Sequence, residues 1–191
     1  MTKRFLLAAA ATLALAACGD AADDTDTTAT TADAGMTEPA VVSPDATGDA
    51  AMPTDAQGFV DQASASDMYE IEAGKLAQQM GKAQAVKDFG GMMVKDHTKS
   101  SSDLKTAASS ATGVTVSPKL SAKQQSDLDA LKSAGDNFDA TYKQQQVAAH
   151  ETALSMLKGY AQSGDTAALK DFAGKTAPVV EGHLAQARKL P

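Results

Sequence analysis

The stretch that decides the fold is Val86–Leu104, which reads VKDFGGMMVKDHTKSSSDL. Lysine, aspartate and serine fill most of its polar positions. Between them, the residues of one face, most of them apolar or small, recur every three or four positions. That spacing is the period of an α-helix with one buried face. The residues on this face are Val86, Gly90, Met93, His97 and Leu104. The stretch therefore predicts the centre of an amphipathic helix over about 82–111.

The same period extends through most of the chain that follows residue 55. It predicts further long helices over about 55–80, 136–162 and 166–189, and a short one over about 121–131. Glycine and proline within 112–118, and glycine at 135 and 164, mark the breaks between them. The outer connections are short and the middle one is longer. This pattern predicts an all-α fold, an antiparallel four-helix bundle with one additional short helix in the middle crossover.

The N-terminal segment predicts export and lipid attachment. Lys3 and Arg4 precede an apolar run over 5–17, which has the anatomy of a signal peptide and is too short to span a bilayer. The chain's one cysteine, Cys18, follows this run directly. The segment resembles the lipobox of bacterial lipoproteins, which implies that residues 1–17 are removed and that Cys18 carries the lipid. An ordinary cleavable signal with a chance cysteine is the alternative.

Residues 18–55 are predicted to form a lipid-bearing cysteine followed by a disordered tether. From 19 to 55 there are nine acidic residues, no basic residue and few large apolar ones, a composition that cannot bury enough surface to fold. Gly19 after the cysteine resembles the sorting rule for outer-membrane lipoproteins, so we expect the membrane-anchored protein at the periplasmic face of the outer membrane. A protein partner in the envelope is also possible on this reading.

Residues 56–191 are predicted to be the folded domain, and its charges balance. Fifteen acidic residues face fifteen basic ones, so no basic patch predicts nucleic-acid binding. Without a second cysteine, the domain has neither a disulfide framework nor a thiolate metal site. No hydrolase, phosphate-loop or zinc-protease motif is present in the sequence.

The chain's three histidines lie on the apolar faces of three different predicted helices. If the second and third long helices are antiparallel, His97 and His150 lie at a similar height, and His183 lies about 7 Å out of register. On the first helix Glu70 is the best-placed inward carboxylate, and Asp67, one turn earlier, is the reserve. Three imidazoles and a carboxylate predict a site for one transition metal ion, either zinc, copper or iron.

The predicted metal ligands are Glu70, His97, His150 and His183, and two other readings stay open. In one, the histidines form a metal-free buried cluster in a structural or interaction bundle. In the other, an oxidase or peroxide-handling enzyme uses the same site, which requires a redox metal and an open coordination position. Because no sequence feature marks a substrate pocket, the non-enzymatic readings are favoured. Asp96, next to His97, is expected to be a surface charge or at most to lie behind a ligand.

Motifs spread over Gly58–Lys189 resemble one bacterial family. They are Glu70-Ile71 with Gly74, Phe89 with Met93-Val94-Lys95-Asp96-His97, Asn137-Phe138-Asp139 with Tyr142, Val147 with His150, and Pro178 with His183-Leu184. Together they resemble the bacterial "domain of unknown function 4142" family. The resemblance implies a ferritin-like four-helix bundle in an exported, often lipid-anchored envelope protein.

Ferritin-like chemistry is nevertheless not predicted. Di-iron bundles place a glutamate three residues before a histidine on two of their helices. In this chain the corresponding positions are Val94, Val147 and Val180. Since paired irons need carboxylate ligands, the sequence argues against ferroxidase activity and iron storage, and it favours a single histidine-rich site.

Overall fold

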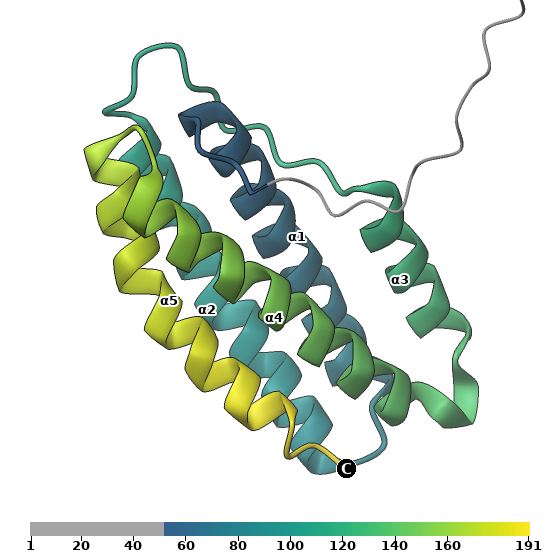
Figure 1. Cartoon of the computed structure of the whole chain (residues 1–191). Helices are drawn as coiled ribbons and strands as arrows, with labels where there is room; N and C mark the ends of the chain where they lie inside the picture. Colours follow the sequence, from purple (N-terminus) through teal and green to yellow (C-terminus); the bar gives the residue numbers. More distant parts are fainter. Residues whose placement is uncertain (1–51) are drawn as a thin grey trace, which may run out of the picture. The chain divides into compact units, whose positions relative to one another are not determined.

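The structure, a computed structural model, describes residues 52–191, so the predicted signal peptide, Cys18 and most of the predicted tether lie outside it. These residues form a helical bundle, as the sequence predicts (Figure 1). Its elements are α1 (Ala56–Met80), α2 (Gln84–Ala108), α3 (Ala122–Ser133), a 3₁₀ turn η1 (Gly135–Asn137), α4 (Phe138–Ser163) and α5 (Ala167–Ala187). Among the described helices, none is both long enough and apolar enough to cross a membrane.

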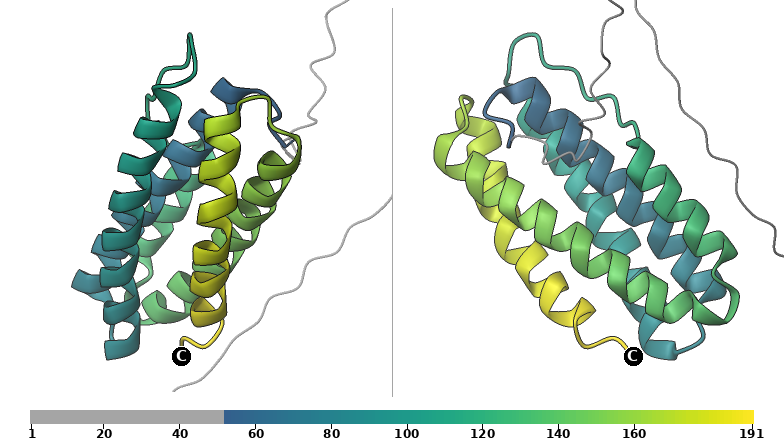
Figure 2. Two further views of the ribbon diagram at one scale, coloured as in Figure 1. Left: turned by 90° about the vertical axis from the view of Figure 1, so that its left-hand side faces the viewer. Right: turned by 45° about the vertical axis from the view of Figure 1, so that its right-hand side comes forward.

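Two helical hairpins, α1–α2 and α4–α5, pack together and form the bundle. The predicted short helix in the middle crossover is present as α3, which contacts α1 and α4 from outside the four long helices (Figure 2). Its first turn has a capping box, in which Ser121 and Gln124 satisfy each other's backbone N–H groups. Because this crossover returns along the length of the bundle, α4 starts at the end where α2 starts.

The N-terminal ends of α2 and α4 are joined by Asp139. Its carboxylate accepts hydrogen bonds from the backbone N–H groups of Lys82 (2.9 Å) and Ala83 (2.8 Å), just before α2. The antiparallel alignment predicted for these two helices is therefore wrong: α2 and α4 run in the same direction on opposite corners of the bundle. Each of the four long helices is antiparallel to the long helices that it packs against (Figure 1).

The first two helices approach each other closely at Gly74 and Gly90. A Cβ atom added at Gly90 would lie 2.7 Å from Ala77 Cβ and 2.7 Å from the Gly74 carbonyl oxygen. Both distances are shorter than van der Waals contact, so only glycine fits at this crossing. The close approach fixes the spacing of α1 and α2 one to two turns away from Glu70 and His97.

A polar layer divides the core into two apolar clusters. One cluster contains Phe59, which stacks on Tyr160 with ring centroids 3.9 Å apart. The other contains Phe89 and Tyr142. The buried polar side chains that separate the clusters along the helices include Asp67, Glu70, His97, Gln146, His150 and His183. We call these six residues the histidine layer.

Candidate metal centre

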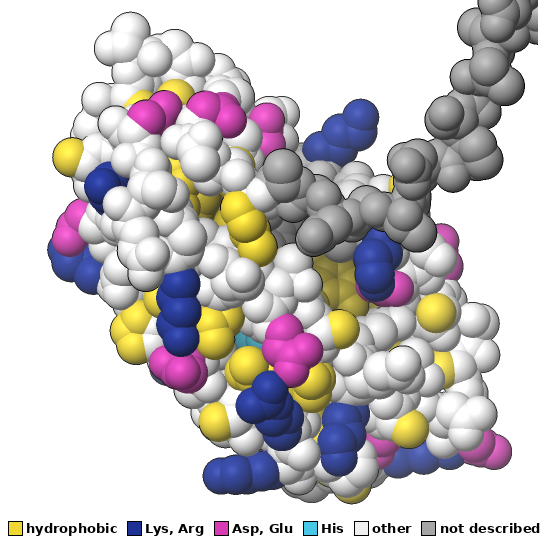
Figure 3. Space-filling view, viewed as in Figure 1, with side chains coloured by type: hydrophobic (Ala, Val, Ile, Leu, Met, Phe, Trp, Pro, Cys, Tyr) yellow, Lys and Arg dark blue, Asp and Glu magenta, His cyan; other side chains and the backbone are white. Residues whose placement is uncertain are grey.

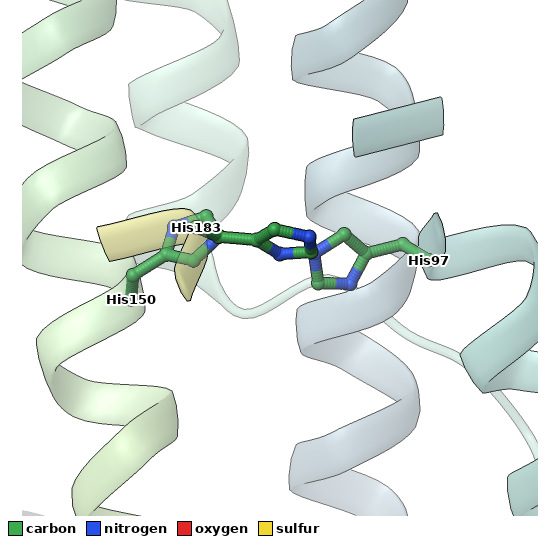
Figure 4. A group of neighbouring side chains, drawn as sticks. All are labelled: His97, His150 and His183. Carbon is green, nitrogen blue, oxygen red and sulfur yellow. The ribbon is translucent and has the colours of Figure 1, made fainter. Parts of the chain in front are cut away.

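The structure brings the three predicted histidines together. His97 comes from α2, His150 from α4 and His183 from α5, and all three are buried. Their ring centroids are 5.6 to 5.8 Å apart, and one ring nitrogen from each lies within 4.8 Å of the other two. Figure 4 shows the three rings meeting between the helices. We call these residues the histidine trio.

The trio forms in spite of the wrong alignment predicted for α2 and α4. His97 and His150 both lie near the middle of their helices, at 13 and 12 residues from the respective N-terminal ends. A residue at mid-helix keeps its height when the helix is reversed, so either direction places the two rings at one level. His183 joins them across the α4–α5 hairpin, where its mismatch in register with His150 is three residues.

Each ring of the trio donates one N–H group to an acceptor outside it. His97 Nδ1 donates to Asp67 Oδ1 (2.8 Å), and His150 Nδ1 donates to the Gln146 carbonyl oxygen (2.8 Å). His183 Nε2 donates to Asp96 Oδ2 (3.1 Å). Such partners fix the tautomer and orientation of histidines that bind metals, and they make the opposite nitrogen more basic.

The opposite nitrogens are left without partners. His97 Nε2, His150 Nε2 and His183 Nδ1 are buried, and none has a hydrogen-bond partner among the described residues. A buried ring nitrogen without a partner is unfavourable by about 1 to 3 kcal/mol. Nitrogens that share one metal at about 2.0 to 2.1 Å lie about 3.4 Å apart. Ring movements of about 1 Å would therefore let the trio hold a single ion.

The electrostatics leave two rings of the trio neutral at pH 7. Burial lowers the pKa of His150 to about 3, and burial also lowers the pKa of His183. Burial acts in the same direction on His97, but the hydrogen bond to Asp67 and the nearby carboxylates outweigh it and raise the pKa of that ring. Of the three rings, His97 is thus the one whose protonated form the surroundings favour. A cation bound to this ring would compete with a proton.

Glu70 lies behind His150, outside the set of atoms that converge. Its Oε1 is 3.7 Å from His150 Nδ1, the nitrogen that is hydrogen-bonded to the Gln146 carbonyl oxygen. Its Oε2 is buried and has no hydrogen-bond partner among residues 52–191. Burial raises the pKa of Glu70 to about 7. Of the four predicted ligands, the structure therefore groups three and places the carboxylate of the fourth against one of them.

The two aspartates have larger roles in the structure than the sequence suggests. Asp67, the predicted reserve ligand, is the buried partner of His97 and also accepts from the Ser101 hydroxyl (3.3 Å). Asp96, expected at the surface or behind a ligand, reaches from α2 to His183 on α5. Its side chain points 100° away from that of His97 around the helix. Only the knowledge that α5 is the neighbour on that side would have identified its partner.

Comparisons with known proteins support the fold. A family model described as "Domain of unknown function (DUF4142)" matches residues 41–190. No curated protein gives a significant match to the sequence.

Solved structures with a similar fold include three of one protein, CopM. The structure of CopM in the Cu(I)-bound form is 19% identical, with a TM-score of 0.60 over 70% of this chain and 92% of that chain. The Ag-bound form is 16% identical, with a TM-score of 0.59 over 71% and 93%. The Cu(II)-bound form is 16% identical, with a TM-score of 0.61 over 71% and 94%. At these identities the likeness shows the shared fold alone.

Proposed function

This chain belongs to the family called domain of unknown function 4142, and we propose that it is a copper-binding protein of the bacterial cell envelope. The proposed ligands are His97, His150 and His183. The observation that carries the proposal is the convergence of three buried histidines, each of which has one ring nitrogen without a hydrogen-bond partner among the described residues.

The donor set favours copper over the other predicted metals. Imidazole binds copper, zinc and iron, but Cu²⁺ binds most tightly to a given set of nitrogen ligands among the divalent first-row ions. The trio contains no carboxylate, which disfavours iron pairs. The structures of CopM in its Cu(I)-, Cu(II)- and Ag-bound forms give this choice independent support, because they share the fold. Zinc is the second candidate, with the same three ligands.

The carboxylates around the trio supply the charge that a buried cation needs. Asp67 and Asp96 each accept a hydrogen bond from an outer ring nitrogen, so their negative charges lie one ring away from the ion. Two such charges balance a divalent cation in the histidine layer. Glu70 adds a third carboxylate beside His150. Copper bound there would supply soft Lewis acidity and one-electron redox chemistry, while these residues hold the rings and balance the charge.

The test is a copper titration of the full chain, purified in mild detergent without an affinity tag. We expect about one equivalent of Cu²⁺ to stay bound after gel filtration, with nitrogen hyperfine coupling in its electron paramagnetic resonance spectrum. Single His97→Gln, His150→Gln and His183→Gln variants should each lose tight binding and keep the helical circular dichroism spectrum. Undiminished binding in all three variants, or no bound copper in the parent, would contradict the proposal.

We also propose that the protein is anchored in the envelope through Cys18, with the acidic residues up to 55 separating the bundle from the membrane. The signal-like run over 5–17 and the small residues before Cys18 support this. Gly19 favours the outer membrane. Fractionation of cells that produce the parent or a Cys18→Ala variant tests the anchor: the parent should be recovered with outer membranes, and the variant should lack the lipid-modified mass.

A further inference from the structure

A metal ion needs a route to the histidine trio, because all three rings are buried. The outer partners of the rings differ in their access to solvent. Asp67 is buried and the Gln146 side chain is fully enclosed. The side chain of Asp96 is 33% exposed. Among the three partners, Asp96 is therefore the one that connects the trio to solvent.

Asp96 lines a groove of about 780 Å³ between α2 and α5. Residues from α2 form one wall, and Thr176 and Val179 are part of the other wall, on α5. Val179 lies one helical turn before His183, and its side chain is among the exposed large apolar ones. The groove thus passes along the surface beside His183, whose hydrogen-bond partner Asp96 is partly exposed.

The charges in this groove leave Asp96 without a lysine. Two other aspartates line it, and each pairs with a lysine one turn away on its own helix, Asp103 with Lys99 and Asp171 with Lys175. Within the described residues, Asp96 has no such pair, and its one ion-pair contact is with His183. A cation that enters the groove therefore meets an uncompensated carboxylate beside His183.

Given the metal binding that we propose for the trio, we infer that metal ions reach the three histidines through the groove between α2 and α5. Asp96 is the first ligand on this route, and His183 passes the ion inward. The ring of His183 spans the barrier, with Nε2 at Asp96 and Nδ1 among the buried nitrogens of the trio. A half-turn of this ring carries a nitrogen from the groove to the interior without opening the bundle.

The opposite side of α5 is the competing route. There the Lys158–Glu181 and Arg188–Glu151 pairs bridge α4 and α5. Figure 3 shows this face, where blue and magenta side chains alternate over α4 and α5 and a small area of histidine surface is visible. Each basic residue of these two pairs is matched by a glutamate, so the pairs leave no free negative charge, whereas the carboxylate of Asp96 has no lysine partner among the described residues. The charges therefore favour the groove.

Stopped-flow mixing of the full chain with Cu²⁺ tests the route, at concentrations where the observed rate is proportional to copper. A Val179→Lys variant should bind copper about three- to tenfold more slowly, and Val179→Asp about three- to tenfold faster, as one added charge near the path of a divalent ion would do. Both differences should shrink at high salt. The copper stoichiometry should not change in either variant.

Two matched lysine variants act as controls. Met68→Lys changes an exposed apolar residue on α1 that lines a separate pocket and not the groove. Ala185→Lys places the charge one turn after Glu181, on the α4 side of α5. Neither should alter the uptake rate by more than about twofold. A slow Ala185→Lys variant with an unaffected Val179→Lys would overturn the route and leave the site intact, and a parent that binds no copper would overturn both.

Discussion

The close crossing of α1 and α2 makes Gly90 a sensitive position, and Gly90→Ala tests how tightly this crossing fixes the bundle. The added methyl group would meet Ala77 Cβ and the Gly74 carbonyl oxygen, each at 2.7 Å. Ordinary contacts between such atoms are about 3.5 to 4.0 Å. Because both obstacles are close to the α1 backbone, the methyl group can be accommodated only if the two helices separate by about 1 Å.

The magnitude follows from two opposing effects. Forcing an extra methyl group into a tight core destabilises a protein by about 1 to 3 kcal/mol, and a backbone obstacle favours the upper end. Replacing glycine with alanine inside a helix stabilises it by about 1 kcal/mol. We therefore expect Gly90→Ala to lower the free energy of unfolding by about 2 kcal/mol. Gly182→Ala is the matched control, because no atom lies within 4 Å of its added Cβ, and it should raise that free energy by about 1 kcal/mol.

Urea denaturation followed by circular dichroism at 222 nm measures both variants on the metal-free protein. The transition midpoints should move in opposite directions, with unchanged slopes. Since Gly90 lies two turns before His97 on α2, wider spacing should also weaken copper binding in Gly90→Ala and leave it unchanged in Gly182→Ala. If Gly90→Ala is as stable as the control, the helices are not held at the distance that the structure shows.

Three further predictions concern carboxylates, two in the histidine layer and one at the end of the bundle where α2 and α4 start. Asp67→Asn should weaken copper binding 10- to 100-fold, as loss of an outer partner does at other metal sites, and competition titration measures it. Glu70→Gln should leave the metal-free protein unchanged below pH 4.5 and make it increasingly more stable than the parent as the pH rises to about 7. The reason is that the Glu70 carboxyl keeps its proton up to about pH 7 in the folded parent but loses it near pH 4.5 in the unfolded chain, so the parent loses stability between these two pH values. Urea titrations of both proteins at several pH values measure this, and equal stabilities of parent and variant at pH 7 would contradict it. Asp139→Ala should destabilise the fold by about 1 kcal/mol, because the backbone N–H groups of Lys82 and Ala83 lose their acceptor. Asp136→Ala, at an exposed carboxylate paired with the Lys82 side chain, should have little effect, and thermal melts of both variants measure the difference.

The sequence predicts the helices well because each carries its own period. The predicted ranges agree with the observed helices to within about three residues, and the short crossover helix is present. The relative direction of α2 and α4 could not be predicted in the same way. It depends on the path of residues 109–137. The hydrophobic period of the sequence is the same whether this crossover returns along the bundle or stays at one end, so the period does not reveal the path. Asp139 shows the same limit, since its partners, the backbone N–H groups just before α2, lie more than fifty residues earlier in the chain.

The candidate site also has one part that the sequence predicts and one part that it does not. The three histidines could be predicted because they are buried on apolar faces at mid-helix or across a short hairpin, where errors in direction have little effect. The sequence could not decide which carboxylate contacts which histidine. Successive residues of a helix point about 100° apart, so a small error in the orientation of a helix changes the neighbours of each side chain. Glu70 and Asp67 share a face of α1, and only the positions of α2 and α4 decide that Asp67 reaches His97 while Glu70 reaches His150.

The histidine layer places several buried polar atoms without partners at one level of the bundle. Apolar side chains could fill this level of the bundle, as they do in the clusters above and below it. Instead the described residues include three ring nitrogens and one carboxylate oxygen of Glu70 that are buried without partners, each unfavourable by about 1 to 3 kcal/mol. A cation held by the trio removes the cost for the three nitrogens at once. It also stabilises the folded state by about 2.7 kcal/mol when the free metal is at one hundred times its dissociation constant. The bundle thus carries a local deficit of stability at the level where the three histidines converge, and the ion that we propose would offset it.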